Sequence, residues 1–320
     1  MKKLSIIIPV YNSEKTIKEV VNRIQCAVET FMADKNYEII LVNDGSRDSS
    51  LKIIKEICIE NKLVKVLNLS KNFGQAHALM AGFGHAQGDY IVCMDDDLQT
   101  PPEEIGKLIK EIKENNYDVV YATYSNNKNS IFRNFGTSIN RLMQSMLINR
   151  PKNVFSSSYF IAKRFVINEI LKYDNPYPYL PGLVFSVTNN VGNIFIEHNI
   201  RKSGKSNYTF KKLISLWLNG FTSFSIKPLR ISTILGFVFS LIGFIFMLVI
   251  IINRLTMPST RLGWTSMMVA IIFFGGIQLL SIGMLGEYIG RIFICINKMP
   301  QYVVRESLNF EGDKNSIDEK

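Results

Sequence analysis

The sequence is poor in cysteine and histidine, the residues that build disulfide frameworks, zinc sites and many acid–base pairs. It contains 4 cysteines and 3 histidines in 320 residues. The cysteines are scattered and show no CxxC spacing, which indicates a reducing compartment and argues against a disulfide scaffold. The histidines (His77, His85 and His198) are scattered as well, and we expect them to have structural rather than catalytic roles.

The features of a cleavable signal sequence are also missing. Met1-Lys2-Lys3 precedes a short apolar run that already contains Pro9, and no cleavage-like site follows it. A signal peptide needs a longer uninterrupted apolar region and a small-residue cleavage site. We therefore expect the N-terminal domain to stay in the cytosol.

Charge is absent from two long stretches, residues 231–252 and 262–286. Each is long enough to cross a hydrocarbon core of about 30 Å, which takes about 20 helical residues. The residues between them, 253–261, include Pro258 and can form only a tight turn. This pattern predicts a transmembrane hairpin over 229–291. The alternative is a pair of buried helices in a large soluble domain.

Acidic residues are absent from Arg201 to Arg230, whereas seven basic residues occur there, and the whole chain has a formal net charge of +10. A basic segment next to an apolar span marks the cytoplasmic side and attracts anionic lipid head groups. We expect residues 209–228 to form an amphipathic helix at the membrane surface. Nucleic-acid binding is the competing interpretation of the charge. No nucleic-acid motif supports it, so we expect a lipid bilayer and no nucleic acid as a partner.

Apolar runs alternate with amphipathic stretches over the first 120 residues, which predicts βαβ units and a parallel sheet. Ser13 is expected to be the N-cap of the first helix, which should run to about Met32. Residues 154–200 show no pattern that we can assign. The expected strands are 4–8, 38–42, 64–69, 90–94 and 118–122, and the expected helices between them are 13–32, 48–61, 74–85 and 102–115.

The most informative segment is Asp95-Asp96-Asp97, which follows the apolar run Tyr90–Met94 and precedes Pro101-Pro102. Three adjacent carboxylates repel one another unless a positive group lies among them. Mg²⁺ and Mn²⁺ prefer carboxylate oxygens and substrate phosphates, so a hard cation with a phosphorylated ligand would satisfy this segment. A solvated acidic turn is the alternative. In parallel sheets ligands bind at the carboxyl ends of the strands. The polar groups there are Tyr11-Asn12, Asp44-Gly45-Ser46 and Asp95-Asp96-Asp97.

These motifs resemble glycosyltransferase family 2, the GT-A fold enzymes that use nucleotide-sugar donors. The resemblance lies in Ile8-Pro9-Val10-Tyr11-Asn12, in Val42-Asn43-Asp44-Gly45-Ser46-Arg47-Asp48 and in Met94-Asp95-Asp96-Asp97-Leu98-Gln99. Asn72-Phe73-Gly74-Gln75 is similar to the polyprenyl-phosphate branch, which includes dolichol-phosphate mannose synthase, bactoprenol glucosyltransferase and the undecaprenyl-phosphate formamido-arabinose transferase. The C-terminal half is similar to the bacterial members through Arg201-x-x-Gly204-x-Ser206-x-Tyr208, Pro228-Leu229-Arg230 and Gly286-Glu287-Tyr288-Ile289-Gly290-Arg291.

The resemblance implies a set of functional residues. Asp97 and Gln99 are expected to hold Mg²⁺ or Mn²⁺, and Asp95, Asp97 and Arg201 are the expected catalytic residues. Asp96 stands where relatives usually have a small residue, and its role is open. The acceptor or donor phosphates are expected to meet Arg133, Arg201, Lys205 and Ser206, although each charge could also be a solvated surface group. The expected nucleotide-sugar contacts are Pro9, Tyr11, Asn12, Asp44, Gly45, Ser46, Asn72, Gln75 and Asp95. For Asp44-Gly45, a plain Asx turn explains the residues equally well.

One departure from the family pattern concerns the acceptor. Many relatives carry Gly-Asp-Phe-Arg-Leu where this chain has Ser157-Ser158-Tyr159-Phe160-Ile161, so the candidate base aligns with Ser158. A neutral sugar hydroxyl needs a base. A lipid phosphate does not, because its second pKa is about 6. Ser158 then need only pack or donate a weak hydrogen bond, although a degraded enzyme is not excluded.

Together these observations predict an α/β GT-A domain over 1–208, followed by the juxtamembrane helix, the hairpin and a cytosolic tail over 292–320 with a disordered end. The expected reaction moves one sugar, with inversion, from a UDP-linked donor to undecaprenyl phosphate, for cell-envelope glycan synthesis or modification. The expected location is the bacterial plasma membrane, and the resemblance implies a homo-oligomer, a tetramer. A processive polysaccharide synthase is one alternative, although the Gln-x-x-Arg-Trp motif is absent. A non-catalytic membrane partner is the other.

Overall fold

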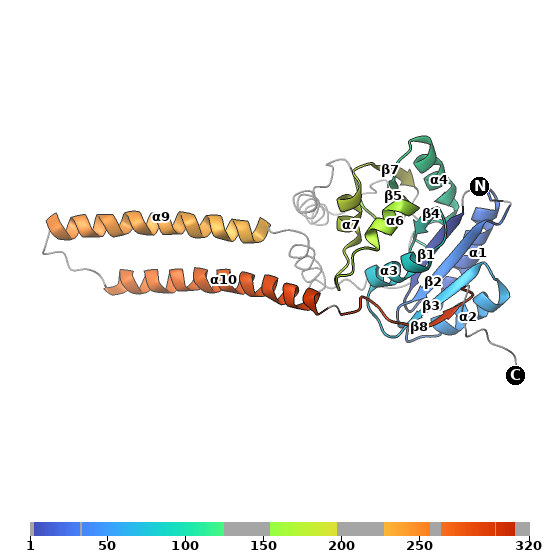
Figure 1. Cartoon of the computed structure of the whole chain (residues 1–320), viewed down its shortest axis with the longest axis horizontal. Coiled ribbons are helices and arrows are strands. Elements are labelled where there is room, and N and C mark those ends of the chain that lie inside the picture. The colour runs from blue at the N-terminus through green and yellow to red at the C-terminus, as the bar shows by residue number, and fades with distance from the viewer. Residues whose placement is uncertain are drawn as a thin grey trace. The chain divides into compact units, whose positions relative to one another are not determined.

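The computed structural model describes residues 3–32, 34–124, 154–196, 227–256, 264–297 and 299–310. The chain divides into two compact units, the first comprising residues 1–207 and 298–320 and the second residues 208–297 (Figure 1). Several expectations fall outside the described residues: Arg133, Arg201, Lys205 and Ser206, the amphipathic helix at 209–228 up to residue 226, and the disordered end of the tail.

The first unit is built on strands that the apolar runs predicted. Their bounds are β1 (Leu4–Val10), β2 (Tyr37–Asn43), β3 (Val64–Leu69), β4 (Tyr90–Cys93) and β5 (Val119–Tyr124). All residues of β1, β2 and β3 are buried. Strands covered on both faces read as continuous apolar runs, and this explains why these segments lack polar alternation.

The helices between these strands are amphipathic. In α4 the buried residues Ile105, Leu108, Ile109 and Ile112 follow helical spacing. Gly82 of α3 packs so closely on the sheet that a Cβ there would lie 2.4 Å from the Ile7 side chain. The described helices between the first strands are α1 (Ile17–Glu29), α2 (Ser50–Glu60), α3 (Gln75–His85), the short η1 (Pro102–Glu104) and α4 (Ile105–Glu114).

The sheet is mixed rather than fully parallel, with the strand order β7-β5-β6-β4-β1-β2-β3-β8. Strands β4, β1, β2 and β3 are parallel neighbours. Strand β6 (Phe160–Lys163) runs antiparallel between β4 and β5, and β7 (Val191–Ile196) pairs with β5. Helices α6 (Arg164–Ile170) and α7 (Leu180–Val187) follow β6. The unassigned stretch 154–200 therefore supplies two strands and two helices to the same unit.

The other edge of the sheet comes from the far end of the chain. Strand β8 (Val304–Leu308) pairs antiparallel with β3 (Figure 1). Lys55 of α2 donates to Glu306 at 2.6 Å, and the Asn309 amide donates to the carbonyl oxygens of Cys58 and Val64. We expected only a cytosolic tail over 292–320. Part of that tail thus completes the sheet.

The second unit contains two long helices, α9 (Lys227–Thr256) and α10 (Trp264–Ile296), which contact each other. Within the described residues, one segment, Phe273–Ile296, is long and apolar enough to cross a membrane. In α9 the apolar segment Gly236–Ile245 is shorter than a span requires. The structure therefore supports a helical pair where we predicted spans at 231–252 and 262–286, but it identifies only one spanning candidate, displaced toward the C-terminus.

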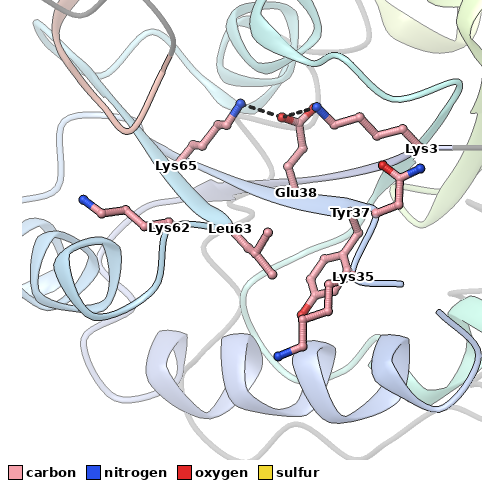
Figure 2. A pocket seen from close by; sticks show the side chains of 8 residues that line it. Lys3, Lys35, Tyr37, Glu38, Lys62, Leu63 and Lys65 are labelled. Carbon is pink, nitrogen blue, oxygen red and sulfur yellow. Dashed lines mark ion pairs between the residues drawn. The ribbon is translucent and has the colours of Figure 1, made fainter. Parts of the chain in front are cut away.

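The amino ends of β1, β2 and β3 close around a buried ionic network (Figure 2). Glu38, which is 2% exposed, accepts hydrogen bonds from the Ser5 hydroxyl and the Gln87 backbone N–H, both at 2.6 Å. The Lys65 ammonium lies 2.7 Å and the Lys3 ammonium 3.7 Å from its other oxygen. A cavity of about 250 Å³ opens beside this network, lined by Lys3, Lys35, Asn36, Tyr37, Glu38, Lys62, Leu63 and Lys65. Because Glu38 already has its counter-charges, this network is structural.

Candidate functional site

The candidate site lies at the opposite end of the strands, where β4, β1 and β2 end side by side. Turns follow the three strands at Tyr11–Ser13, Asp44–Ser46 and Met94–Gln99. Hydrogen bonds join the turns to one another: the Asn12 backbone N–H donates to the Ser46 hydroxyl at 3.1 Å, and the Tyr11 backbone N–H donates to Asp96 at 3.2 Å. The juxtaposition expected for a parallel sheet is therefore present.

Asp44 is buried, with 3% of its surface exposed. Its two carboxylate oxygens accept backbone N–H groups from Phe73 at 2.7 Å and Gly74 at 2.9 Å. The Asn72 side chain donates to the Asp44 carbonyl oxygen at 3.0 Å. Asp44 thus fixes the loop before α3, a role that the Asx-turn interpretation does not include. Burial raises its pKa, against the lowering effect of these two N–H groups.

Gly45 is required by its backbone conformation and by its neighbours. Its φ angle is +66°, a value that residues with a side chain rarely adopt. A Cβ there would lie 2.5 Å from the Asn72 nitrogen. The missing side chain of Gly45 therefore permits the close approach of the 71–72 backbone, and the expected contact of Gly45 with a nucleotide stays a prediction.

Asp95 is held from two sides. The Gln75 amide at the start of α3 donates to one oxygen at 2.7 Å, and the Ser158 hydroxyl donates to the other at 2.5 Å. Burial raises the pKa of Asp95, as does the charge of Asp97, while the two hydrogen bonds oppose the rise. Ser158 thus contacts the carboxylate cluster directly.

Asp96 turns to the β1 side of the site. One of its oxygens accepts two hydrogen bonds, one from the Tyr11 backbone N–H and one from the Ser13 hydroxyl. The expected N-cap role of Ser13 is therefore wrong: α1 begins at Ile17 after Thr16, and the Ser13 side chain serves Asp96 instead. Burial raises the pKa of Asp96 to about 6, and the charges of Asp95 and Asp97 add to the rise.

Asp97 and Gln99 are adjacent in space because the chain turns sharply between them. The Gln99 backbone N–H donates to Asp97 at 3.1 Å. Leu98, which is buried, has a φ angle of +62°. This conformation is an outlier for a bulky residue, and such strain concentrates at binding and catalytic sites. The turn thus holds Asp97 and Gln99 together at the end of β4.

The donor set at this end fits a hard cation with few protein ligands. Within the described ranges, no group of three or more His, Cys, Asp or Glu side chains is arranged to hold a metal ion. Mg²⁺ usually keeps waters and takes only one or two carboxylates together with substrate phosphates. A carboxylate and an amide on one turn, Asp97 and Gln99, match that requirement.

The predicted nucleotide contacts gather around these turns. Tyr11 is 41% exposed, Asn12 has a φ angle of +55°, and Gln75 reaches Asp95. Pro9 is buried in β1 opposite Val42, beyond the last pairing of β1 with β4 at Ile7. Sequence reasoning missed Ser13, and it gave Ser158 too small a role. The sequence did offer a signal for Ser13 and Ser158. Several carboxylates lie on these turns, and each carboxylate needs hydrogen-bond donors.

The comparisons with known proteins identify the family of this chain. The pattern of Glycosyl transferase family 2 matches residues 5–171, and that of the GtrB C-terminal hairpin matches residues 227–292. The chain belongs to glycosyltransferase family 2 and is a glycosyltransferase. It is 35% identical over 313 residues to the uncharacterized glycosyltransferase YkcC of Bacillus subtilis (strain 168), covering 97% of this chain and 95% of that protein.

Solved structures share the fold at low identity. Glucosyl-3-phosphoglycerate synthase of Mycobacterium tuberculosis, in complex with Mn²⁺, UDP and phosphoglyceric acid, gives a TM-score of 0.50 at 17% identity, covering 73% of this chain and 78% of that chain. Another structure of that synthase gives a TM-score of 0.49 at 18% identity, covering 69% of this chain and 81% of that chain. The GT-A-like α/β fold of the first unit is thereby supported.

Proposed function

We propose that this glycosyltransferase moves a single sugar from a UDP-linked donor to undecaprenyl phosphate at the cytosolic face of the bacterial plasma membrane. The observation that carries the proposal is the carboxylate cluster at the ends of β4, β1 and β2, in a chain that also matches the GtrB C-terminal hairpin. A nucleotide site joined to a membrane hairpin suits a soluble donor and a lipid acceptor.

The donor diphosphate would lie against the Asp97–Gln99 turn, and the nucleoside would lie against the Tyr11–Ser13 and Asp44–Ser46 turns. A bound Mg²⁺ or Mn²⁺ would neutralise the diphosphate and stabilise the leaving group. The residues of this chain would supply the ligands, Asp97 and Gln99, and their hydrogen bonds fix the turns. Asp95, held by Gln75 and Ser158, would face the nucleotide sugar, and Arg201 would meet phosphate.

The chemistry at Ser158 favours an acceptor that is already ionised. A serine hydroxyl that donates to Asp95 cannot take a proton from a sugar hydroxyl. A lipid phosphate oxygen carries negative charge at neutral pH and can attack the anomeric carbon without a base. Direct attack with loss of the nucleoside diphosphate inverts the configuration at that carbon.

The test uses the purified full chain in detergent with undecaprenyl phosphate and a panel of UDP- and GDP-sugars. The expected product is a lipid monophosphate that carries one sugar, identified by mass spectrometry, and its formation should stop in excess EDTA. Long glycan products would instead indicate a processive synthase. Nucleotide binding without turnover on any donor would indicate a non-catalytic membrane partner.

Membrane topology provides a separate test. We expect both chain ends in the cytosol and the turn near Pro258 on the far side. The 4 native cysteines are first replaced, and one cysteine is introduced at Ser259. This cysteine should react with an impermeant reagent in intact cells. Protection there, together with labelling of a C-terminal cysteine, would show the reverse orientation.

A further inference from the structure

Asp96 has no part in the donor chemistry proposed above, yet it makes two contacts across a long separation in sequence. Its Oδ2 atom accepts the Tyr11 backbone N–H at 3.2 Å and the Ser13 hydroxyl. Both donors belong to the turn after β1, whereas Asp96 belongs to the turn after β4. A single carboxylate oxygen therefore joins two turns of the candidate site.

The turn after β1 depends on such contacts because it is strained. Asn12 at its centre has a φ angle of +55°. On the β2 side, the Ser46 hydroxyl accepts the Asn12 N–H at 3.1 Å, and the Asn12 side chain accepts the Arg47 N–H at 2.8 Å. Asp96 supplies the matching contacts on the β4 side. The other hydrogen bonds that join Asn12 and Ser13 to neighbouring turns reach Ser46, Arg47 and Ser50, on the β2 side and in α2.

We propose that Asp96 is a positioning residue that holds the Tyr11–Ser13 turn against the Asp95–Asp97 segment. The nucleoside side and the diphosphate side of the donor site would then keep a fixed separation. This proposal rests on the proposed function, because it assumes that a nucleoside diphosphate bridges the two turns. It also accounts for an aspartate where relatives usually have a small residue.

The alternative role for Asp96 is that of a metal ligand, and the two roles differ in what an amide can replace. Asparagine keeps a carbonyl oxygen that accepts both the Tyr11 N–H and the Ser13 hydroxyl, but it loses the negative charge. Alanine loses both. A positioning role is therefore partly rescued by Asp96→Asn, whereas a ligand role is not.

The experiment compares Asp96→Ala, Asp96→Asn and Ser13→Ala in the full chain in detergent. Hydrogen exchange of the Tyr11 amide reports the contact directly and needs no nucleotide. Isothermal titration with UDP and Mn²⁺ reports the donor site. Asp96→Ala removes the acceptor of both hydrogen bonds, so it should speed Tyr11 exchange and weaken UDP binding about tenfold or more. Asp96→Asn should recover most of both, and Ser13→Ala should lie between them.

An internal control is the Asp44 amide, which donates to the Val10 carbonyl oxygen at 2.9 Å and does not contact Asp96. Its exchange should stay unchanged in all variants. The proposal is overturned if Tyr11 exchange is the same in every variant, or if Asp96→Asn loses Mn²⁺-dependent UDP binding as fully as Asp96→Ala. If Asp96→Ala does not fold, Ser13→Ala and Asp96→Asn decide the outcome. Absence of UDP binding by the wild type would count against the proposed function, while the exchange result would still decide the role of Asp96.

Discussion

At the amino ends of the strands, Glu38 meets the ammonium groups of Lys65 and Lys3, whereas at the carboxyl ends Asp95 and Asp96 meet hydroxyl, amide and backbone donors. Glu38 is buried, whereas Asp95 and Asp96 are half-buried. The pKa of Glu38 is lowered, because the Lys65 ammonium and the donors from Ser5 and Gln87 outweigh burial. The pKa values of Asp95 and Asp96 are raised, because burial outweighs neutral donors.

This difference distinguishes a carboxylate whose counter-charge lies within the protein from Asp95 and Asp96, which accept from neutral donors. A buried charge that is paired within the protein needs no ligand to balance it. Half-buried carboxylates with raised pKa values at strand ends are functional-site candidates with a physical reason. A cavity lies beside Glu38, yet the electrostatics favour the other end of the sheet as the candidate site.

The largest expected effect is a loss of activity from a change at the carboxyl ends of the strands. Asp97→Asn should lower sugar transfer by roughly a thousandfold or more, because the site loses its main anionic ligand. The thermal midpoint of unfolding should change little. Near-normal turnover of this variant, measured with undecaprenyl phosphate and the active donor, would contradict the metal assignment.

A change at the amino ends of the strands should instead lower the stability of the protein. Glu38→Ala leaves the Lys65 ammonium buried without its partner, which should cost about 3–5 kcal/mol of folding free energy. Thermal unfolding in detergent measures the loss. Glu38→Gln, which keeps the acceptor oxygen for Ser5, is the matched control and should lose less. A Glu38→Ala protein that stays as stable as wild type would break the distinction between the two ends.

A smaller effect is expected at Ser158. Ser158→Ala removes one of the two hydrogen bonds to Asp95, so turnover should fall about tenfold. Ser158→Asp should lower it further, because a second carboxylate would face Asp95 at hydrogen-bonding distance. Initial rates at saturating donor provide the comparison. Higher activity for Ser158→Asp than for wild type would mean that the family base can be restored, and our account of the acceptor would then be wrong.

The smallest effect is a pH dependence of stability. Because the folded-state pKa of Glu38 is below its ordinary value of about 4.3, its contribution is full above that pH and is lost as the pH falls through the folded value. The difference in unfolding midpoint between wild type and Glu38→Gln should therefore shrink on acidification below about pH 4.3. A difference that grows on acidification would reverse the sign of the argument.

The sequence predicted the first half of the fold well, because β1, β2 and β3 are mostly apolar and α4 has clear helical spacing. It failed for β6, β7 and β8, which are short and pair with strands distant in sequence. Such strands depend on tertiary pairing rather than on their own pattern.

The candidate site was predicted through its carboxylates but not through their partners. A motif identifies Asp95 and Asp97, whereas the donors Ser13 and Ser158 lie 83 and 63 positions from the carboxylates they contact. Ser13 also resembled a helix cap, since a serine before an amphipathic stretch usually is one. Only the folded chain shows that its hydroxyl is used elsewhere.

Strand β8 has a consequence for the order in which the protein is made. The edge of β3 is covered by residues that follow the whole second unit, 208–297, in the chain. At about 5–20 residues per second, the ribosome needs roughly 5–20 s to synthesise that unit. During this interval β3 has an unpaired edge, which invites aggregation. The sheet of the glycosyltransferase domain therefore cannot be completed before the whole second unit has been translated.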